Sequence, residues 1–253
     1  MLNKKILSLS VVLFLAIELI LGILMFRPNL GDASRALRFG SVLLACAFCA
    51  LFFERSWDYV LTQIAFVLAI CADGFLVLPS PPIQLPGVFL FTASYLTYAA
   101  LLYISEPRPA YRKLHLILRI AIPCAALVAT VLVLGEGCDT LALASVFCFA
   151  NLGLNVIFAA HQFRRQAVLA VGFLLLFISD MILGLSFITP YIPMSTRSVP
   201  YRMVHSGFDF IWAFYLPAQV LLAFSLFAKR WNAARPACRK APSEPDSEPA
   251  QTR

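Results

Sequence analysis

Eight apolar stretches run along this chain, and each is long enough to cross the hydrocarbon core of a bilayer. A helix needs about 20 predominantly apolar residues for that crossing, because it rises only about 1.5 Å per residue. The stretches lie at residues 6–26, 36–53, 59–78, 87–105, 114–134, 140–160, 167–188 and 208–228. The short connections between them favour antiparallel neighbours. The sequence therefore predicts an all-α, polytopic membrane protein, a bundle of eight transmembrane helices.

Composition supports an integral membrane protein. The chain is 61% hydrophobic and only 13% charged, with a mean hydropathy of +0.84, whereas a soluble domain carries about a quarter charged residues. The net charge of +7 comes from loops and tail, where membrane topology and lipid headgroups explain it. We therefore expect membrane lipid as a partner, and no nucleic acid.

The charges also divide the chain and orient it. Residues 1–230 form the predicted transmembrane domain; beyond them Pro, Ser and Glu alternate, so residues 231–253 are predicted to be a disordered tail. Basic residues favour the cytoplasmic side of a membrane, and the more basic side places both termini in the cytoplasm. That side carries Lys4, Lys5, Arg55, Arg108, Arg112, Lys113, Arg164, Arg165, Lys229 and Arg230. The other side carries Arg27, Arg35, Arg38, Arg197 and Arg202.

Two acids lie deep inside apolar stretches, Asp73 and Asp180. A carboxylate in hydrocarbon is costly, and it usually has a pairing partner, a water-filled cavity or a chemical task. Small or hydroxylic neighbours, such as Ala72 and Ser179, let such a group face the bundle interior. We interpret the two acids as a functional pair; the alternative is a structural hydrogen bond between helices.

Further polar residues are predicted at similar depths. At about 1.5 Å per residue, Asp73 lies roughly 8 Å from the outer end of its stretch, while Asp180 and Glu18 lie roughly 12 Å from theirs. The other polar residues at this level are Tyr95, Tyr98, Tyr215 and Gln219. The prediction is one polar pocket in the outer half of the membrane, in which the two aspartates face each other across water.

Four motifs on these stretches resemble the YhhN-like lysoplasmalogenase family. They are GFLLLFISD at 172–180, DGFL at 73–76, Gly87 with Phe91 leading to Tyr98, and YLPAQ at 215–219. Their order and spans agree, and the resemblance covers roughly residues 6–228. Two positions depart from the family pattern: Tyr95 stands where histidine is usual, and Ala72 where glycine is usual.

The resemblance implies hydrolysis of the vinyl-ether bond of lysoplasmalogens, which releases a fatty aldehyde and a glycerophospho-alcohol. The expected substrate is thus a lysophospholipid. Asp73 and Asp180 would be catalytic, and the expected substrate-binding residues are Tyr95, Tyr98, Ser179, Tyr215, Gln219 and Glu18. Two carboxyl groups suit this chemistry: one protonates the enol ether at carbon, and the other stabilises the cation and activates water, as in glycosidases.

The sequence lacks the motifs of other hydrolase classes. The sequence has no G-x-S-x-G element for a serine hydrolase and no H-E-x-x-H zinc motif. Cys46-x-x-Cys49 stands without a second pair, so we expect no metal site and no cofactor. Two alternatives remain open: a small proton-coupled transporter, because buried acids can relay protons, and a lipid-binding membrane protein without catalysis.

Overall fold

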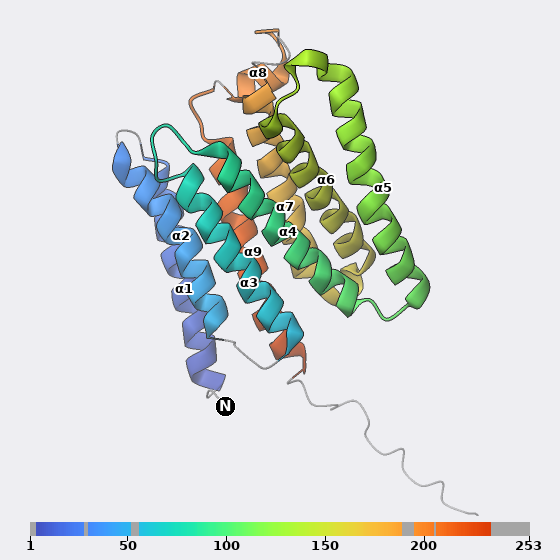
Figure 1. The fold of residues 1–253 in the computed structure, drawn as a ribbon. Coiled ribbons are helices and arrows are strands. Elements are labelled where there is room, and N and C mark those ends of the chain that lie inside the picture. The colour runs from blue at the N-terminus through green and yellow to red at the C-terminus, as the bar shows by residue number, and fades with distance from the viewer. Residues whose placement is uncertain (1–3, 28–29, 52–55, 189–194, 205, 234–253) are drawn as a thin grey trace, which may run out of the picture.

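Long helices form nearly the whole of the structure. The computed structural model describes residues 4–27, 30–51, 56–188, 195–204 and 206–233 (Figure 1). The helices are α1 (Lys4–Met25), α2 (Asp32–Ala50), α3 (Trp57–Leu76), α4 (Gln84–Ser105), α5 (Pro109–Leu134), α6 (Thr140–His161), α7 (Phe163–Ile188), α8 (Val199–Val204) and α9 (Phe210–Ala233), with a 3-10 turn η1 (Gly135–Gly137). In these ranges eight helices are long and apolar enough to cross a membrane. The predicted all-α bundle of eight spans is confirmed.

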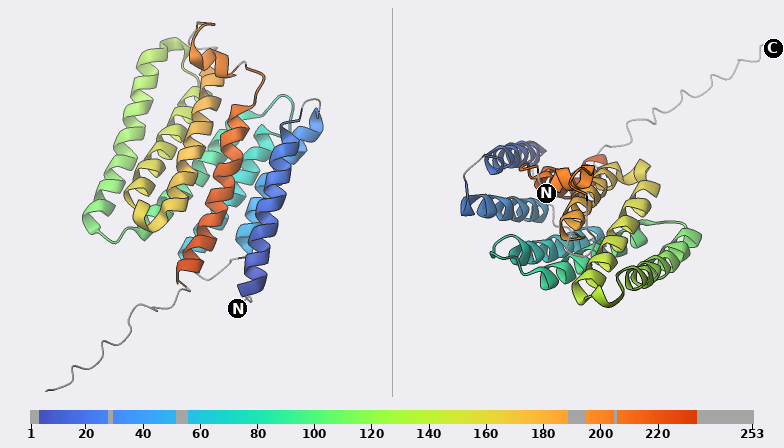
Figure 2. Two further views of the ribbon diagram at one scale, coloured as in Figure 1. Left: turned by 180° about the vertical axis from the view of Figure 1, so that it is seen from behind. Right: turned by 90° about the horizontal axis from the view of Figure 1, so that it is seen from above.

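The bundle has two ends that differ in the segments they carry. α1 begins and α9 ends at one of them, here called the terminal end, while the short helix α8 lies at the opposite end (Figures 1 and 2). Of the predicted tail at 231–253, residues 234–253 lie outside the described residues. The assignment of the terminal end to the cytoplasm stays a prediction.

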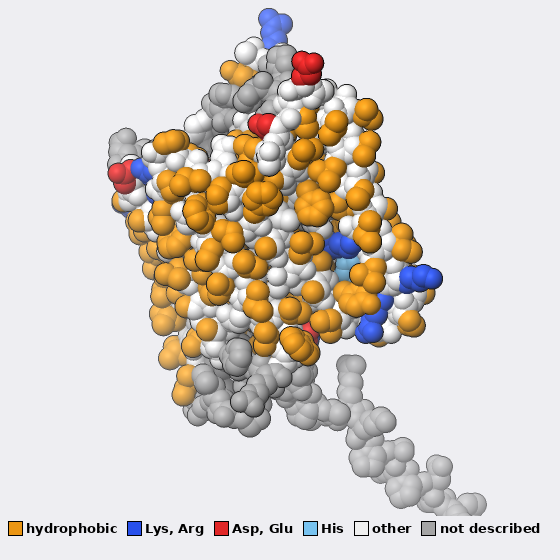
Figure 3. Space-filling model, in the orientation of Figure 1, with side chains coloured by type: hydrophobic (Ala, Val, Ile, Leu, Met, Phe, Trp, Pro, Cys, Tyr) orange, Lys and Arg blue, Asp and Glu red, His pale blue; other side chains and the backbone are white. Residues whose placement is uncertain are grey.

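Four helices make the centre of the bundle. α7 packs extensively against α9, and α3 against α4, while α6 contacts both α4 and α7. α1 and α2 pack on one flank, and α5 rests mainly on α6 with only His115 and Pro123 buried. Figure 3 shows hydrophobic side chains over most of one flank, as expected of a surface that faces lipid. The central helices α3, α4, α7 and α9 carry both predicted catalytic residues.

Local signals explain where the helices near α6 begin and end. Gly135 has a φ of 54°, a conformation that glycine adopts without steric cost, and it directly follows α5. The Asp139 side chain accepts a hydrogen bond of 2.7 Å from the Ala142 amide and so caps the first turn of α6. These two residues set the reversal between α5 and α6.

Gly172 on α7 lies directly against Leu222 on α9. A Cβ added there would lie 3.0 Å from Leu222 Cδ2 and 3.3 Å from the Leu222 backbone nitrogen. Side chains can shift cheaply, but a backbone nitrogen moves only with its helix. The glycine of the 172–180 motif therefore has a packing reason: it lets α9 lie directly against the helix that carries Asp180.

Gly172→Ala should lower the thermal unfolding midpoint of the purified protein in detergent. Overpacking of this kind costs about 1–3 kcal/mol, more than the roughly 1 kcal/mol that alanine gains over glycine in helix propensity. Gly184→Ala is the matched control on the same helix, because nothing lies within 4 Å of its Cβ position. Equal midpoints for the two variants would show that α7 and α9 have room to adjust.

Candidate functional site

Two tyrosine–aspartate hydrogen bonds lie at the centre of the bundle. The Tyr95 hydroxyl on α4 donates to Asp180 Oδ2 on α7 over 2.6 Å. The Tyr215 hydroxyl on α9 donates to Asp73 Oδ2 on α3 over 2.7 Å. Each phenol engages one of the two carboxylate oxygens. The structure thus brings together four of the predicted site residues from four helices.

The two pairs are reciprocal. The closely packed helices α3 and α4 supply Asp73 and Tyr95, and the closely packed helices α7 and α9 supply Asp180 and Tyr215. Each acid is therefore held by a tyrosine from the other pair of helices. The two hydrogen bonds tie the halves of the centre together at the level of the carboxyl groups.

Aromatic contacts join the two pairs into one cluster. The Phe91 ring lies 5.9 Å from the Tyr95 ring and 6.2 Å, edge-on, from the Tyr215 ring. Asp73 and Asp180 lie within electrostatic range of each other, and Tyr215 is within range of both. The structure therefore places the two acids near each other, while a shared water-filled pocket stays a prediction.

Gln219, Trp212 and Cys148 extend this cluster. The Gln219 side chain lies close to that of Tyr215, one turn away along α9, and the Trp212 ring packs edge-on against Tyr215 at 4.9 Å. Cys148 on α6 lies within electrostatic range of Asp180. Its position beside the acid depends on how α6 packs, which the apolar run around it does not reveal.

The two acids differ in exposure. Asp73 is only 3% exposed, whereas Asp180 is half-buried. Asp180 is thus the more accessible of the two acids.

Two other predicted substrate-binding residues make different contacts. Tyr98 is buried and packs edge-on against Phe173 at 5.1 Å. Ser179 donates to the backbone carbonyl of Ile211 over 3.0 Å and so links α7 to α9. The structure does not bring these side chains to the carboxyl groups, and their role in substrate binding stays a prediction.

Glu18 forms a separate polar contact. Its Oε2 accepts a hydrogen bond of 2.6 Å from Ser41 on α2, and Oε1 is buried with no partner among the described residues. Arg38, which could have neutralised it, instead lies 2.6 Å from Asp209 and packs over the Trp212 ring at 5.5 Å. Glu18 is therefore a further buried acid, and its contact lies between α1 and α2.

The opposite end of the bundle holds basic residues near the cluster. Arg38 joins that end to the aspartate cluster through Trp212, which contacts Tyr215. Arg35 bonds to Asp32 and to the Leu78 carbonyl. Three further predicted arginines of this end are exposed: Arg27, Arg197 and Arg202.

A polar network that was not predicted from the sequence contacts the backbone of Tyr95. Arg119 on α5 donates to the Asn151 carbonyl over 2.7 Å, to the Asn155 side chain, and to His115 over 3.1 Å. Asn155 in turn donates to the Tyr95 backbone carbonyl over 2.9 Å. Arg119 stands in an apolar stretch as Asp73 does, so its charge was the signal that could have revealed the network.

The best-defined cavities of the described chain do not lie at the carboxyl groups. They lie at the terminal end, around Asp58 and Arg165. Side chains pack closely around Asp73, so a lipid can reach both acids only when side chains or helices of the cluster move apart. The described residues include no group of three or more His, Cys, Asp or Glu side chains that could hold a metal ion.

Chemically, the cluster offers two carboxyl groups, each held by a phenol, in a mainly apolar enclosure. Such a pair can share the transfer of a proton and the stabilisation of a cation. Comparison with known families matches residues 33–226 to the YhhN family. Searches of curated proteins and of solved structures gave no match. The family match spans well over half of the chain and includes both aspartates and both tyrosines. On this evidence of sequence and fold, the chain belongs to the YhhN family.

Proposed function

We propose that this protein hydrolyses the vinyl-ether bond of lysoplasmalogens within the membrane. The observation that carries the proposal is the reciprocal arrangement of Tyr95 with Asp180 and Tyr215 with Asp73. Membership of the YhhN family supports it, because the lysoplasmalogenase-like motifs lie on the helices that build this arrangement. The substrate is a lysophospholipid whose chain lies between helices.

The reaction needs one proton donor and one base. A carboxylic acid of the pair protonates the vinyl carbon further from the ether oxygen, which gives an oxocarbenium ion stabilised by the other, ionised carboxylate. That carboxylate then removes a proton from water as the water attacks the carbon bonded to oxygen. The resulting hemiacetal collapses to a fatty aldehyde and the glycerophospho-alcohol, so one water is consumed and no cofactor is required.

The phenols have a positioning role in this mechanism. Each fixes one carboxylate oxygen at a hydrogen-bond distance, which leaves the side-chain rotation of the acid restricted. A fixed acid and a fixed base hold the reacting atoms near their productive geometry, and such orientation contributes to the rate. Tyr95 performs this role at the position where the family usually has histidine.

The test is aldehyde release by the full purified chain in detergent micelles. We expect free aldehyde from a 1-alkenyl lysophospholipid, and none from the matched 1-alkyl ether, which has no double bond to protonate. A 1-acyl lysophospholipid, whose ester needs attack at a carbonyl, should also remain intact. Absence of aldehyde from the alkenyl lipid would contradict the proposal. Proton-dependent solute uptake into liposomes would then favour the transporter.

A further inference from the structure

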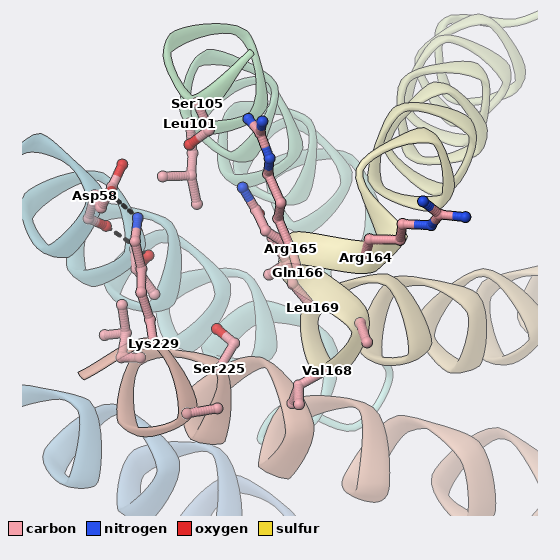
Figure 4. A pocket seen from close by; sticks show the side chains of 14 residues that line it. Asp58, Leu101, Ser105, Arg164, Arg165, Gln166, Val168, Leu169, Ser225 and Lys229 are labelled. Atoms are coloured by element: carbon pink, nitrogen blue, oxygen red, sulfur yellow. Dashed lines mark hydrogen bonds and ion pairs between the residues drawn. The ribbon is translucent and has the colours of Figure 1, made fainter. Parts of the chain in front are cut away.

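A polar hollow opens between four helices at the terminal end of the bundle. α3, α4, α7 and α9 all contribute to its lining, and its volume is about 150 Å³ (Figure 4). A wider hollow of about 570 Å³ adjoins it. The two share Asp58, Ser105, Arg165, Gln166 and Lys229. Polar side chains from helices far apart in the sequence thus converge on one space.

The charge of this space is positive. Lys229 pairs with Asp58 across the hollow, so those two charges balance. Arg165 extends from the start of α7 toward the end of α4 (Figure 4), and its guanidinium has no ion-pair or hydrogen-bond partner in the part of the chain that the structure describes. Arg164, its neighbour, also lines the hollow, and its side chain extends away from that of Arg165 (Figure 4).

Arg108, another basic residue at this end of the bundle, already has a carboxylate partner. The Arg108 guanidinium lies 2.7 Å from Glu106 and bonds both of its carboxylate oxygens. These hydrogen bonds from Arg108 lower the pKa of Glu106, which lies just beyond the apolar part of α4. Arg108 is therefore committed to a carboxylate of the chain, in contrast to Arg165.

A neutral donor also lies in the hollow without a partner. The Ser105 hydroxyl oxygen is buried and makes no hydrogen bond within the described residues. Buried polar atoms are rarely left unsatisfied, because the loss of hydration is costly. A hydroxyl that can donate, beside a guanidinium that can donate twice, suits an anion with several oxygens.

The hollow lies where the apolar spans stop. The span of α4 ends at Ser105 and that of α9 at Lys229, so the space is at the level of lipid headgroups. Arg165 directly precedes a kink of α7 at Gln166, and the 14 residues from Gln166 to Asp180 correspond to about 21 Å along a helix. In a lysophospholipid only the glycerol unit separates the ether bond from the phosphate. A substrate bound at Asp180 cannot therefore place its phosphate here.

We propose that this hollow is a second, non-catalytic site that binds a phosphate group, with Arg165 as its principal ligand and Ser105 as a further donor. Basic pockets between helices near the membrane surface suit anionic lipid headgroups. The lipid headgroup and free phosphate share this chemistry, and the experiment separates them.

The test is isothermal titration calorimetry on the full chain in a zwitterionic detergent, without substrate. The probes are dioctanoyl phosphatidic acid, dioctanoyl phosphatidylcholine and inorganic phosphate. We expect phosphatidic acid to bind and phosphatidylcholine not to bind. Tighter binding of phosphatidic acid than of inorganic phosphate assigns the site to a lipid headgroup; equal binding assigns it to free phosphate. Binding of neither phosphate probe would overturn the proposal.

Single variants of residues in the hollow test whether the phosphate probe binds there. Arg165→Gln should weaken binding by about 10- to 100-fold, the usual value of hydrogen bonds to a charged group. Ser105→Ala should weaken it less, by about threefold to tenfold. Arg164→Gln removes the same charge one residue away and should weaken binding much less than Arg165→Gln does. Unaltered binding by Arg165→Gln, or equal losses in the two arginine variants, would show that the anion responds only to general surface charge.

Discussion

Asp180→Asn should reduce aldehyde release from an alkenyl lysophospholipid by about 10²–10⁴-fold, the usual contribution of a general acid or base. This corresponds to roughly 3–5 kcal/mol of barrier. An amide can neither donate a carboxylic proton nor carry the negative charge that stabilises an oxocarbenium ion. Tyr95, which donates to Asp180 Oδ2, can donate equally to an asparagine oxygen, so the fold should be retained. The measurement is the initial rate of aldehyde formation at matched protein concentration.

Asp139→Asn is the matched control for this variant. It makes the same chemical change outside the candidate site, and asparagine caps a helix about as well as aspartate does, so α6 should keep its first turn. The control should turn over as the wild-type protein does. Near-normal turnover by Asp180→Asn would mean that Asp180 is a structural acid, and the two-acid mechanism would fail.

Asp73→Asn should produce a loss of similar size, and the double variant should be little worse than either single one. Residues that act as a unit in one transition state show strongly non-additive losses. Two independent contributions would instead multiply to about 10⁴–10⁸-fold. The measurement is a double-mutant cycle on the rate of aldehyde release with Asp73→Asn, Asp180→Asn and both together.

Tyr215→Phe gives the comparison that separates chemistry from positioning at Asp73. It keeps the carboxyl group and removes only the hydrogen bond of 2.7 Å, so its loss should be about 10-fold, well below that of Asp73→Asn. If Tyr215→Phe and Asp73→Asn lose activity equally, the pair acts by holding α3 against α9. Fully multiplicative losses in the cycle would separate the two acids into independent roles.

The sequence was sufficient to predict the eight spans, because their length and apolarity follow directly from the thickness of the bilayer. It also placed Asp73 and Asp180 at one level, because the rise of a helix converts residue number into depth. Depth alone does not determine rotation about the helix axis. The pairing of Tyr95 with Asp180, rather than of Tyr98, depends on how α4 turns toward α7, and that is fixed by packing at many residues together.

Because depth does not determine rotation or helix packing, the contacts of Ser179 and Glu18 also could not be predicted from the sequence. Ser179 is adjacent to Asp180 in the chain, but consecutive residues on a helix point about 100° apart, and its hydroxyl bonds instead to a carbonyl of α9. Glu18 has the depth of the cluster, yet its helix packs mainly on α2, where Ser41 meets it. Arg119 could have been found from its charge within an apolar run, but its partners on α6 could not.

The reciprocal tyrosine–aspartate pairs have a consequence for the biosynthesis of the protein. Asp73 enters the membrane with the third span, but its partner Tyr215 is on α9, the last long helix that the structure describes. During synthesis Asp73 therefore lacks this hydrogen bond until five further spans have been inserted. The two acids acquire both of their phenols only when α9 docks against α7 and brings Tyr215 to Asp73. An incompletely inserted chain cannot assemble the cluster. Both tyrosine–aspartate pairs therefore form only in the complete bundle.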